Sequence, residues 1–184
     1  MPRIAIVSDT HVPSRERTIP DWVVDEIERA DRTIHAGDFD SSETYERLVD
    51  LAGGPSSLTA VRGNVDPATL DVPTTATLTV GGVTFVVTHG TGSPRGWLER
   101  VVEIVRGEAG ADADPVAVAG HTHEVVDTVV DSDERDAAGG RTASGDGIRV
   151  LNPGSATGAS PADRATMLVA TVEDGSLAVE ERTD

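Results

Sequence analysis

Short apolar runs rich in Val and Ile recur along the whole chain, and turn-forming residues lie between them. Runs of about four to eight residues with many β-branched side chains are typical of buried strands. This pattern predicts ten strands, which cover the ranges Arg3–Ser8, Arg32–Ala36, Ser57–Val61, Ala76–Val80, Val83–Thr88, Val116–Ala119, Glu124–Val130, Gly147–Leu151, Arg164–Val172 and Ser176–Glu181.

Three segments have apolar residues at helical spacing instead. Asp21–Ala30 follows Pro20, and Ser41 or Ser42 provides an N-cap for a helix that runs to Leu51. The third segment, Arg95–Arg106, places its apolar residues on one face.

The order of these elements predicts the fold class. The first third of the chain alternates strand and helix, which favours a parallel sheet with crossover helices. Later strands flank Gly81-Gly82 and Asp174-Gly175, both typical of hairpins. No repeat or linker divides the chain, so we expect one α/β domain over residues 1–184, with two packed sheets and helices outside. The polar stretch Asp131–Asp146 is expected to be an exposed loop, whose part in gating a site stays open.

Composition narrows the class of protein. The chain has 184 residues and no apolar stretch long enough to span a membrane as a helix. The apolar run Met1–Ser8 is too short for a signal peptide, so we interpret it as the first strand of a cytoplasmic protein. The chain has no cysteine, which excludes disulfides, iron–sulfur sites and thiol nucleophiles.

The charge of the chain is strongly negative. The formal net charge is -17, and all 15 basic residues are Arg. A salt-adapted, halophilic surface explains this better than a partner with a basic surface. Stable nucleic-acid docking is not expected, because phosphate backbones need basic contacts. A small phosphate substrate stays open, because metal ions can supply local positive charge.

Carboxylates, an amide and histidines directly follow five of the predicted strands. In open α/β sheets, ligand-binding and active sites lie at the carboxyl ends of the strands. The five loops should therefore bring these side chains together. The seven residues are Asp9, His11, Asp38, Asn64, His89, His121 and His123.

This set of side chains suits a pair of divalent metal ions. Two ions about 3.5–4 Å apart need a bridging carboxylate, and Asp38 is the natural bridge. Mixed nitrogen and oxygen ligands suit Mn, Fe, Co, Ni or Zn better than Mg or Ca. The ligand set does not choose among these metals, and we take Mn²⁺ as the first expectation. We assign catalytic work to Asn64, Asp38 and His89.

Each motif alone has a simpler explanation. Asp9 resembles a helix cap, Asn64 suits a left-handed turn, and His121-Thr122-His123 resembles a pair on a surface strand. Only the joint pattern predicts a metal centre. His35 lies inside a strand, and we interpret it as a packed histidine rather than a ligand.

The joint motif resembles the calcineurin-like metallophosphoesterases, in particular their small bacterial and archaeal phosphodiesterases. The family order D-x-H, G-D, G-N, H and G-H-x-H is present here, and Asn152-Pro153-Gly154-Ser155 resembles the closing motif of that subgroup. The resemblance implies a four-layer αββα sandwich. It also implies one ion held by Asp9, His11, Asp38 and His123 and another held by Asp38, Asn64, His89 and His121.

The resemblance implies hydrolysis of a small phosphodiester by a hydroxide that bridges the two ions. Two positions depart from the family pattern: Val65 stands where larger relatives carry a His, and Thr91 where many small relatives carry one. A general acid contributes about 10²–10⁴-fold, so modest activity on good leaving groups is expected. Asp66 is a partial substitute for that acid or a plain turn residue before Pro67.

Other functions stay open. A eukaryotic member of the subgroup is a trafficking scaffold that has lost ligands, so this chain could be an interaction module. A phosphomonoesterase or nucleotide hydrolase would use the same ligands. The sequence leaves open a homo-oligomer and a phosphate contact by Arg95 or Arg164.

Overall fold

The computed structural model describes residues 1–109, 114–131 and 147–184. In this part of the chain it shows three helices and two five-stranded sheets. All ten predicted strands and all three predicted helices are present. Most of the predicted loop Asp131–Asp146 lies outside the described residues. No described helix is long and apolar enough to cross a membrane.

The first sheet has the strand order β10-β9-β1-β2-β3. Its strands β1, β2 and β3 are parallel, as the alternation of strands and helices predicts, and β9 and β10 add an antiparallel edge. The bounds are β1 Arg3–Val7, β2 Arg32–His35, β3 Leu58–Ala60, β9 Thr166–Glu173 and β10 Ser176–Thr183.

The second sheet has the strand order β4-β5-β6-β8-β7. Its three central strands are parallel, and an antiparallel strand lies at each edge. The bounds are β4 Thr75–Val80, β5 Val83–Thr88, β6 Val116–Val118, β7 Val125–Val130 and β8 Ile148–Pro153.

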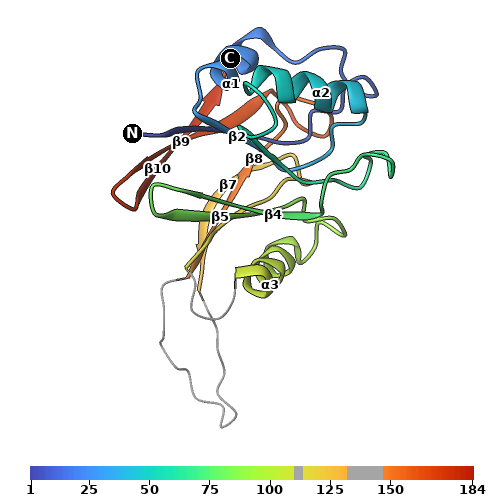
Figure 1. Ribbon diagram of the computed structural model, residues 1–184. Coiled ribbons are helices and arrows are strands. Elements are labelled where there is room, and N and C mark those ends of the chain that lie inside the picture. Colours follow the sequence, from blue (N-terminus) through green and yellow to red (C-terminus); the bar gives the residue numbers. More distant parts are fainter. Residues whose placement is uncertain (110–113, 132–146) are drawn as a thin grey trace.

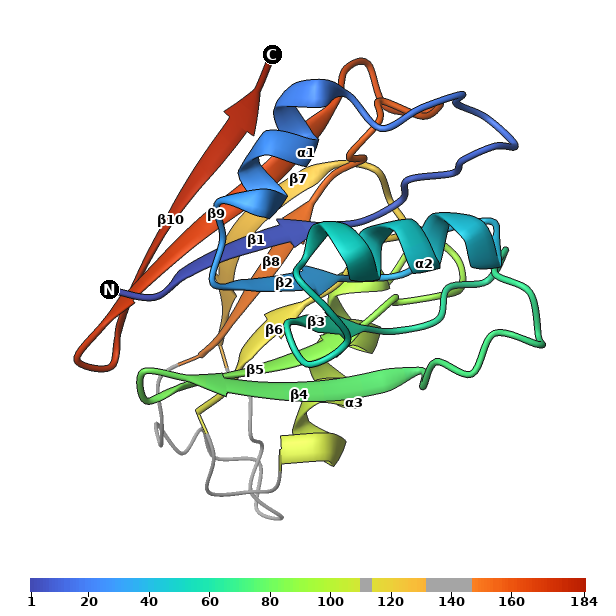
Figure 2. The same cartoon turned by 45° about the horizontal axis from the view of Figure 1, so that its top comes forward.

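The helices cover the two outer faces of the paired sheets. Figures 1 and 2 show α1 (Asp21–Glu28) and α2 (Ser42–Leu51) over the first sheet and α3 (Trp97–Ala109) over the second. This arrangement confirms the predicted four-layer αββα sandwich. The Ser41 hydroxyl accepts a hydrogen bond from the Thr44 N–H, so Ser41 is the N-cap of α2.

Side-chain alternation along the strands builds the core between these layers. In β1, Ile4 and Ile6 pack between the two sheets, while Ala5 and Val7 pack under α1 and α2. A third apolar cluster lies between α3 and the second sheet. Because the central strands are buried on both faces, they are continuous apolar runs in the sequence.

Some element ends differ from the prediction. The strand predicted to end at Leu151 continues to Pro153, because Asn152 and Pro153 pair with Val126 and Val125 of β7. The predicted helix Arg95–Arg106 begins at Trp97, after Pro94 and Gly96, and runs to Ala109. Helix ends depend on capping and fraying, which periodicity does not report.

Candidate metal centre

The seven predicted ligands lie in the loops that follow β1, β2, β3, β5 and β6. These five strands run parallel to neighbours in their sheets, and their carboxyl ends meet at one edge of the sandwich. Backbone hydrogen bonds join the loops: the Asp9 N–H donates to the Gly37 carbonyl at 3.0 Å, and the Gly120 N–H donates to the His89 carbonyl at 3.2 Å.

Five of these residues have a left-handed backbone, which is uncommon outside glycine. The φ angles are 51° at Asp9, 50° at His11, 62° at Asp38, 76° at His121 and 60° at His123. Such conformations cost free energy and cluster at functional sites, where the surrounding structure holds them. The loops are therefore shaped to aim these side chains rather than to minimise strain.

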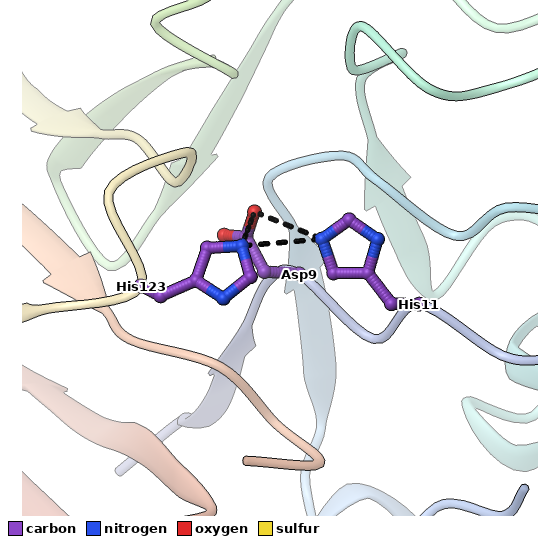
Figure 3. A group of neighbouring side chains, drawn as sticks. All are labelled: Asp9, His11 and His123. Carbon is purple, nitrogen blue, oxygen red and sulfur yellow. Dashed lines mark hydrogen bonds and ion pairs between the residues drawn. The ribbon is translucent and has the colours of Figure 1, made fainter. Parts of the chain in front are cut away.

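One group consists of Asp9, His11 and His123, whose side chains point toward one another (Figure 3). The Asp9 Oδ1 atom lies 3.8 Å from His11 Nε2 and 3.3 Å from His123 Nε2. The two Nε2 atoms are 3.2 Å apart. All three side chains are buried, so the group lies at the bottom of the loops.

A second group joins Asp9 to Asp38 and His89. The Asp38 Oδ2 atom lies 3.2 Å from His89 Nε2 and 3.6 Å from His11 Nε2, so one carboxylate oxygen faces both groups. The side chain of Asn64 adds its Oδ1 atom, 3.2 Å from His89 Nε2. Asp38 has the position that a bridging ligand needs.

His121 lies beside the second group without joining it. Its ring is 5.1 Å from the ring of His89, centre to centre, and its Nε2 atom is bonded to the Gly92 carbonyl at 2.6 Å. Its Nδ1 atom is therefore the nitrogen left for a ligand. The structure brings six of the predicted ligands together and places His121 at their edge.

Backbone carbonyls fix which nitrogen carries the proton in two of the buried histidines, His89 and His123. The carbonyls of Ala36 and Ala159 accept from Nδ1 of His89 and His123, at 2.7 and 2.8 Å. A carbonyl only accepts, so each neutral ring has its lone pair on Nε2, which faces the group. Metal-ligating histidines use this same arrangement.

The donor set fits divalent cations. Asp9 Oδ1 is buried and has no hydrogen-bond partner among the described residues, which is costly unless a cation satisfies it. Two lone pairs on neighbouring Nε2 atoms also need a cation or proton between them. The residues present therefore suit a pair of metal ions with nitrogen and oxygen ligands.

In the metal-free protein, protons can bind to the same side-chain nitrogen and oxygen atoms. Burial alone lowers the pKa of His89, but the hydrogen bond to Asp38 and the charges of Asp9 and Asp38 raise it to about 9. Burial opposes the charged form of Asp9 as well, yet the neighbouring rings of His11 and His123 hold the pKa of Asp9 well below its usual range. Metal ions and protons thus compete for these atoms.

Two aspartates support the predicted ligands, and the sequence did not single out these roles. Asp40 accepts from His11 Nδ1 at 2.9 Å and thereby orients that ring. Asp66 accepts four backbone N–H bonds, from Asp38, Phe39 and Asp40 and from Gly63, at 2.6 to 3.0 Å. Asp66 therefore holds two ligand loops together. Because its carboxylate acts only as an acceptor in these four bonds, Asp66 is not placed as a general acid.

The closing motif Asn152–Ser155 ties the remaining loops. The Asn152 amide donates to the Gly120 carbonyl and to Thr122 Oγ1 within the His121–His123 loop. The Ser155 hydroxyl donates to the Asp9 carbonyl at 2.7 Å. These bonds fix the backbone on either side of the first group.

His35 is packed, as its position in a strand predicts. It is fully buried and stacks on Phe39, and its ring nitrogens bond the Thr10 hydroxyl and the Gly37 N–H. Burial lowers its pKa to about 3, so it stays neutral. Arg164, one of the two arginines considered for phosphate, forms an exposed ion pair with Glu181.

Comparison with known protein families identifies the superfamily of this chain. The model of the calcineurin-like phosphoesterase superfamily domain matches residues 2–175. The chain belongs to this superfamily. A probable metallophosphoesterase of Methanocaldococcus jannaschii is 35% identical over 156 residues, which are 84% of this chain and 68% of the relative.

Solved structures share the fold. Vps29 of Chaetomium thermophilum has a TM-score of 0.70 at 19% identity, and the match covers 100% of this chain and 98% of that one. A structure described as a novel archaeal phosphodiesterase has a TM-score of 0.63 at 22% identity, over 98% and 99% of the two chains. Both likenesses concern the fold alone.

Proposed function

We propose that this protein is a phosphodiesterase with two divalent metal ions, Mn²⁺ foremost, acting on a small phosphodiester. The observation that carries the proposal is the place of Asp38. One of its carboxylate oxygens faces His11 on one side and His89 on the other, at 3.6 and 3.2 Å. A carboxylate oxygen that faces a histidine of each group is the arrangement that a dinuclear centre requires.

Each ion would have its own ligands besides Asp38. One would be held by Asp9, His11 and His123, and the other by Asn64, His89 and the Nδ1 atom of His121. When bound, the pair would lower the pKa of a water molecule and neutralise charge on the phosphate. The positive charge they bring would compensate the acidic site, because the pKa values of Asp9 and Asp38 are both lowered there.

The chain itself would position the substrate and offer little acid catalysis. Asn64 is exposed, and its Oδ1 faces His89. Its amide nitrogen has no partner among the described residues and could donate to a phosphate oxygen. At Val65, where larger relatives carry a His, only the backbone N–H takes part, and it donates to Asp38 Oδ1 at 3.1 Å. We therefore expect diesters with good leaving groups, such as aryl diesters, to react fastest.

The test is hydrolysis of bis-p-nitrophenyl phosphate beside p-nitrophenyl phosphate, in molar KCl, with and without Mn²⁺. We expect metal-dependent cleavage of the diester, with the monoester cleaved more slowly. Asp38→Asn should abolish turnover, because an amide cannot bridge two cations. Asp25→Asn on α1, whose side chain is 55% exposed, is the matched control and should keep full activity.

Other outcomes decide between the remaining functions. Faster cleavage of the monoester would contradict the phosphodiesterase and favour a phosphomonoesterase. A folded protein that binds two ions yet cleaves neither ester would favour an interaction scaffold of the same fold. In that case Val65 and Thr91 would be the first positions to restore as histidines.

A further inference from the structure

Two cavities adjoin the candidate metal centre. The first, of about 500 Å³, includes His121 in its wall, and we call it the Trp97 cavity. The second, of about 580 Å³, includes His89, and we call it the Arg62 cavity. The rings of these two histidines are 5.1 Å apart, so a phosphate bound at the centre would have access to both cavities.

The walls of the Trp97 cavity are mainly apolar. They come from the start of α3, from β7 and from the loops beside them, and include Pro94, Trp97, Leu98, Val126 and Pro161. Trp97 is only 5% exposed and packs in the core layer under α3, so this wall is firmly held. Concave apolar sites of this size are typical of pockets for small organic groups.

The charged side chains in the wall of the Trp97 cavity are carboxylates. Glu99 and Glu124 line it, and both are exposed. The nearby guanidinium of Arg100 is directed to backbone carbonyls, donating to Gly90 at 3.0 Å and Ser93 at 2.9 Å. A second anionic group would therefore meet like charge here. The Arg62 cavity also contains two carboxylates, Glu103 and Glu108, but it offers the cation Arg62 and several threonine hydroxyls beside them.

We propose that the Trp97 cavity binds one ester substituent of the substrate, and that this substituent is an uncharged, largely apolar organic group. The proposal rests on the proposed function and names its substrate class. A chain of nucleotides is disfavoured at this side, because its next phosphate would face Glu99 and Glu124. The cavity selects by burying apolar surface and by repelling anions.

Binding tests the cavity without metal or turnover. The chain has two Trp residues, so Trp22→Phe on α1 leaves Trp97 as the fluorescent reporter. The probes are 4-nitrobenzyl alcohol, which is uncharged, and 4-nitrobenzoate, which is an anion of similar shape. The alcohol should quench Trp97 saturably, with a dissociation constant on the order of millimolar, as ligands of that size allow. The benzoate should bind roughly tenfold more weakly at low salt, where charges are least screened.

A variant without the two carboxylates shows whether the benzoate binds weakly because of charge repulsion or because of its shape. Glu99→Gln/Glu124→Gln should bring benzoate binding within about threefold of the alcohol, because the repelling carboxylates are gone. The control Glu28→Gln/Glu46→Gln removes two exposed carboxylates from α1 and α2 and should leave the difference unchanged. Equal binding of both probes to the unaltered cavity, or quenching that never saturates, would overturn the proposal.

Turnover then distinguishes failure of the cavity from failure of the function. With Mn²⁺, benzyl p-nitrophenyl phosphate should have a kcat/KM roughly tenfold above that of its 4-carboxybenzyl analogue, because the anion is repelled. If neither diester is cleaved while the alcohol still binds selectively, the phosphodiesterase is wrong and the cavity stands. If both are cleaved equally and neither probe binds, the cavity proposal is wrong and the phosphodiesterase stands.

Discussion

Three of the histidines at the candidate site have one ring nitrogen bonded to a backbone carbonyl, and the fourth is bonded to a carboxylate. The carbonyls belong to Ala36, Gly92 and Ala159, and the carboxylate to Asp40. Because each ring is fixed in this way, its other nitrogen is left for a metal ion. The metal-binding chemistry of these residues is thus decided by atoms that are not ligands themselves.

Asp66 supplies the first prediction at this scale. Asp66→Asn should lower the free energy of unfolding by about 2–4 kcal/mol, because an amide cannot accept four N–H bonds. Affinity for Mn²⁺ should fall as well, since the loops of Asp38 and Asn64 lose their common anchor. Urea denaturation and calorimetric titration measure the two effects, with Asp25→Asn as control. A stable variant that has lost only the alkaline limb of its pH–rate profile would show Asp66 to be a general acid instead.

His89 makes the metal-free protein sensitive to pH. Its pKa is raised from 6.5 to about 9 on folding, so the protonated form stabilises the native state. This contribution is complete below about pH 6.5 and is lost as the pH rises through 9, with a magnitude on the order of 2–3 kcal/mol. Urea denaturation of chelator-treated protein across this range measures it.

The His89→Gln variant isolates this contribution. It should remove most of the loss of stability between about pH 6.5 and 9. If the variant and the unaltered protein lose stability in parallel over this range, another group is responsible and the ion pair with Asp38 does not hold the proton.

At the scale of elements, the loops approach one another so closely that two glycines have no room for a side chain. A Cβ atom at Gly63 would overlap the Asp38 carboxylate, and one at Gly120 would lie 2.6 Å from Asp9 Oδ2. The Asp38 carboxylate and the Asp9 carboxylate would both be displaced. Backbone approach, rather than conformational freedom alone, therefore requires glycine at these two positions.

This crowding gives a prediction with a matched control. Gly63→Ala should cost about 1–3 kcal/mol of stability by overpacking, and should weaken Mn²⁺ binding by displacing Asp38. Gly107→Ala in α3 meets no atom within 4 Å and should instead stabilise by about 0.5–1 kcal/mol, since Ala favours helix. Thermal unfolding and metal titration of both variants test this. Unchanged metal affinity in Gly63→Ala would contradict the close approach.

The sequence predicts the secondary-structure elements and the ligands better than it predicts the residues that hydrogen-bond to the ligands and their loops. Strands and strand-end ligands are local features, visible as apolar runs followed by Asp, Asn or His. The roles of Asp40, Asp66 and Asn152 depend on contacts between distant loops, which no spacing reports. The role of Asp40 had one indication in the sequence: a carboxylate two residues from a predicted ligand is a candidate hydrogen-bond partner for a ligating histidine. The sequence also could not predict that His121 lies at the edge of the site.

At the scale of the whole molecule, packing of two sheets face to face unites the site. The first sheet supplies Asp9, His11, Asp38 and Asn64, and the second supplies the remaining histidines. The apolar layer between the sheets, which includes Ile6 and Val87, therefore sets the distance between the two halves of the candidate centre.

The net charge of -17 concerns the whole molecule too. Self-repulsion of an acidic surface weakens the compact state, and salt screens it. We predict that the Tm rises by several degrees between roughly 0.1 and 1 M KCl, because the Debye length falls from about 10 Å to about 3 Å over this range. Glu28→Gln/Glu46→Gln, which removes two exposed charges, should show a smaller rise. A Tm that is flat or falls with KCl would contradict a salt-adapted surface.

The most direct test of the dinuclear centre is anomalous scattering from crystals grown with Mn²⁺. We predict two peaks about 3.5–4 Å apart on either side of Asp38 Oδ2. One should lie among Asp9, His11 and His123, and the other beside Asn64, His89 and His121 Nδ1. A single peak, or two peaks that Asp38 does not bridge, would contradict the account.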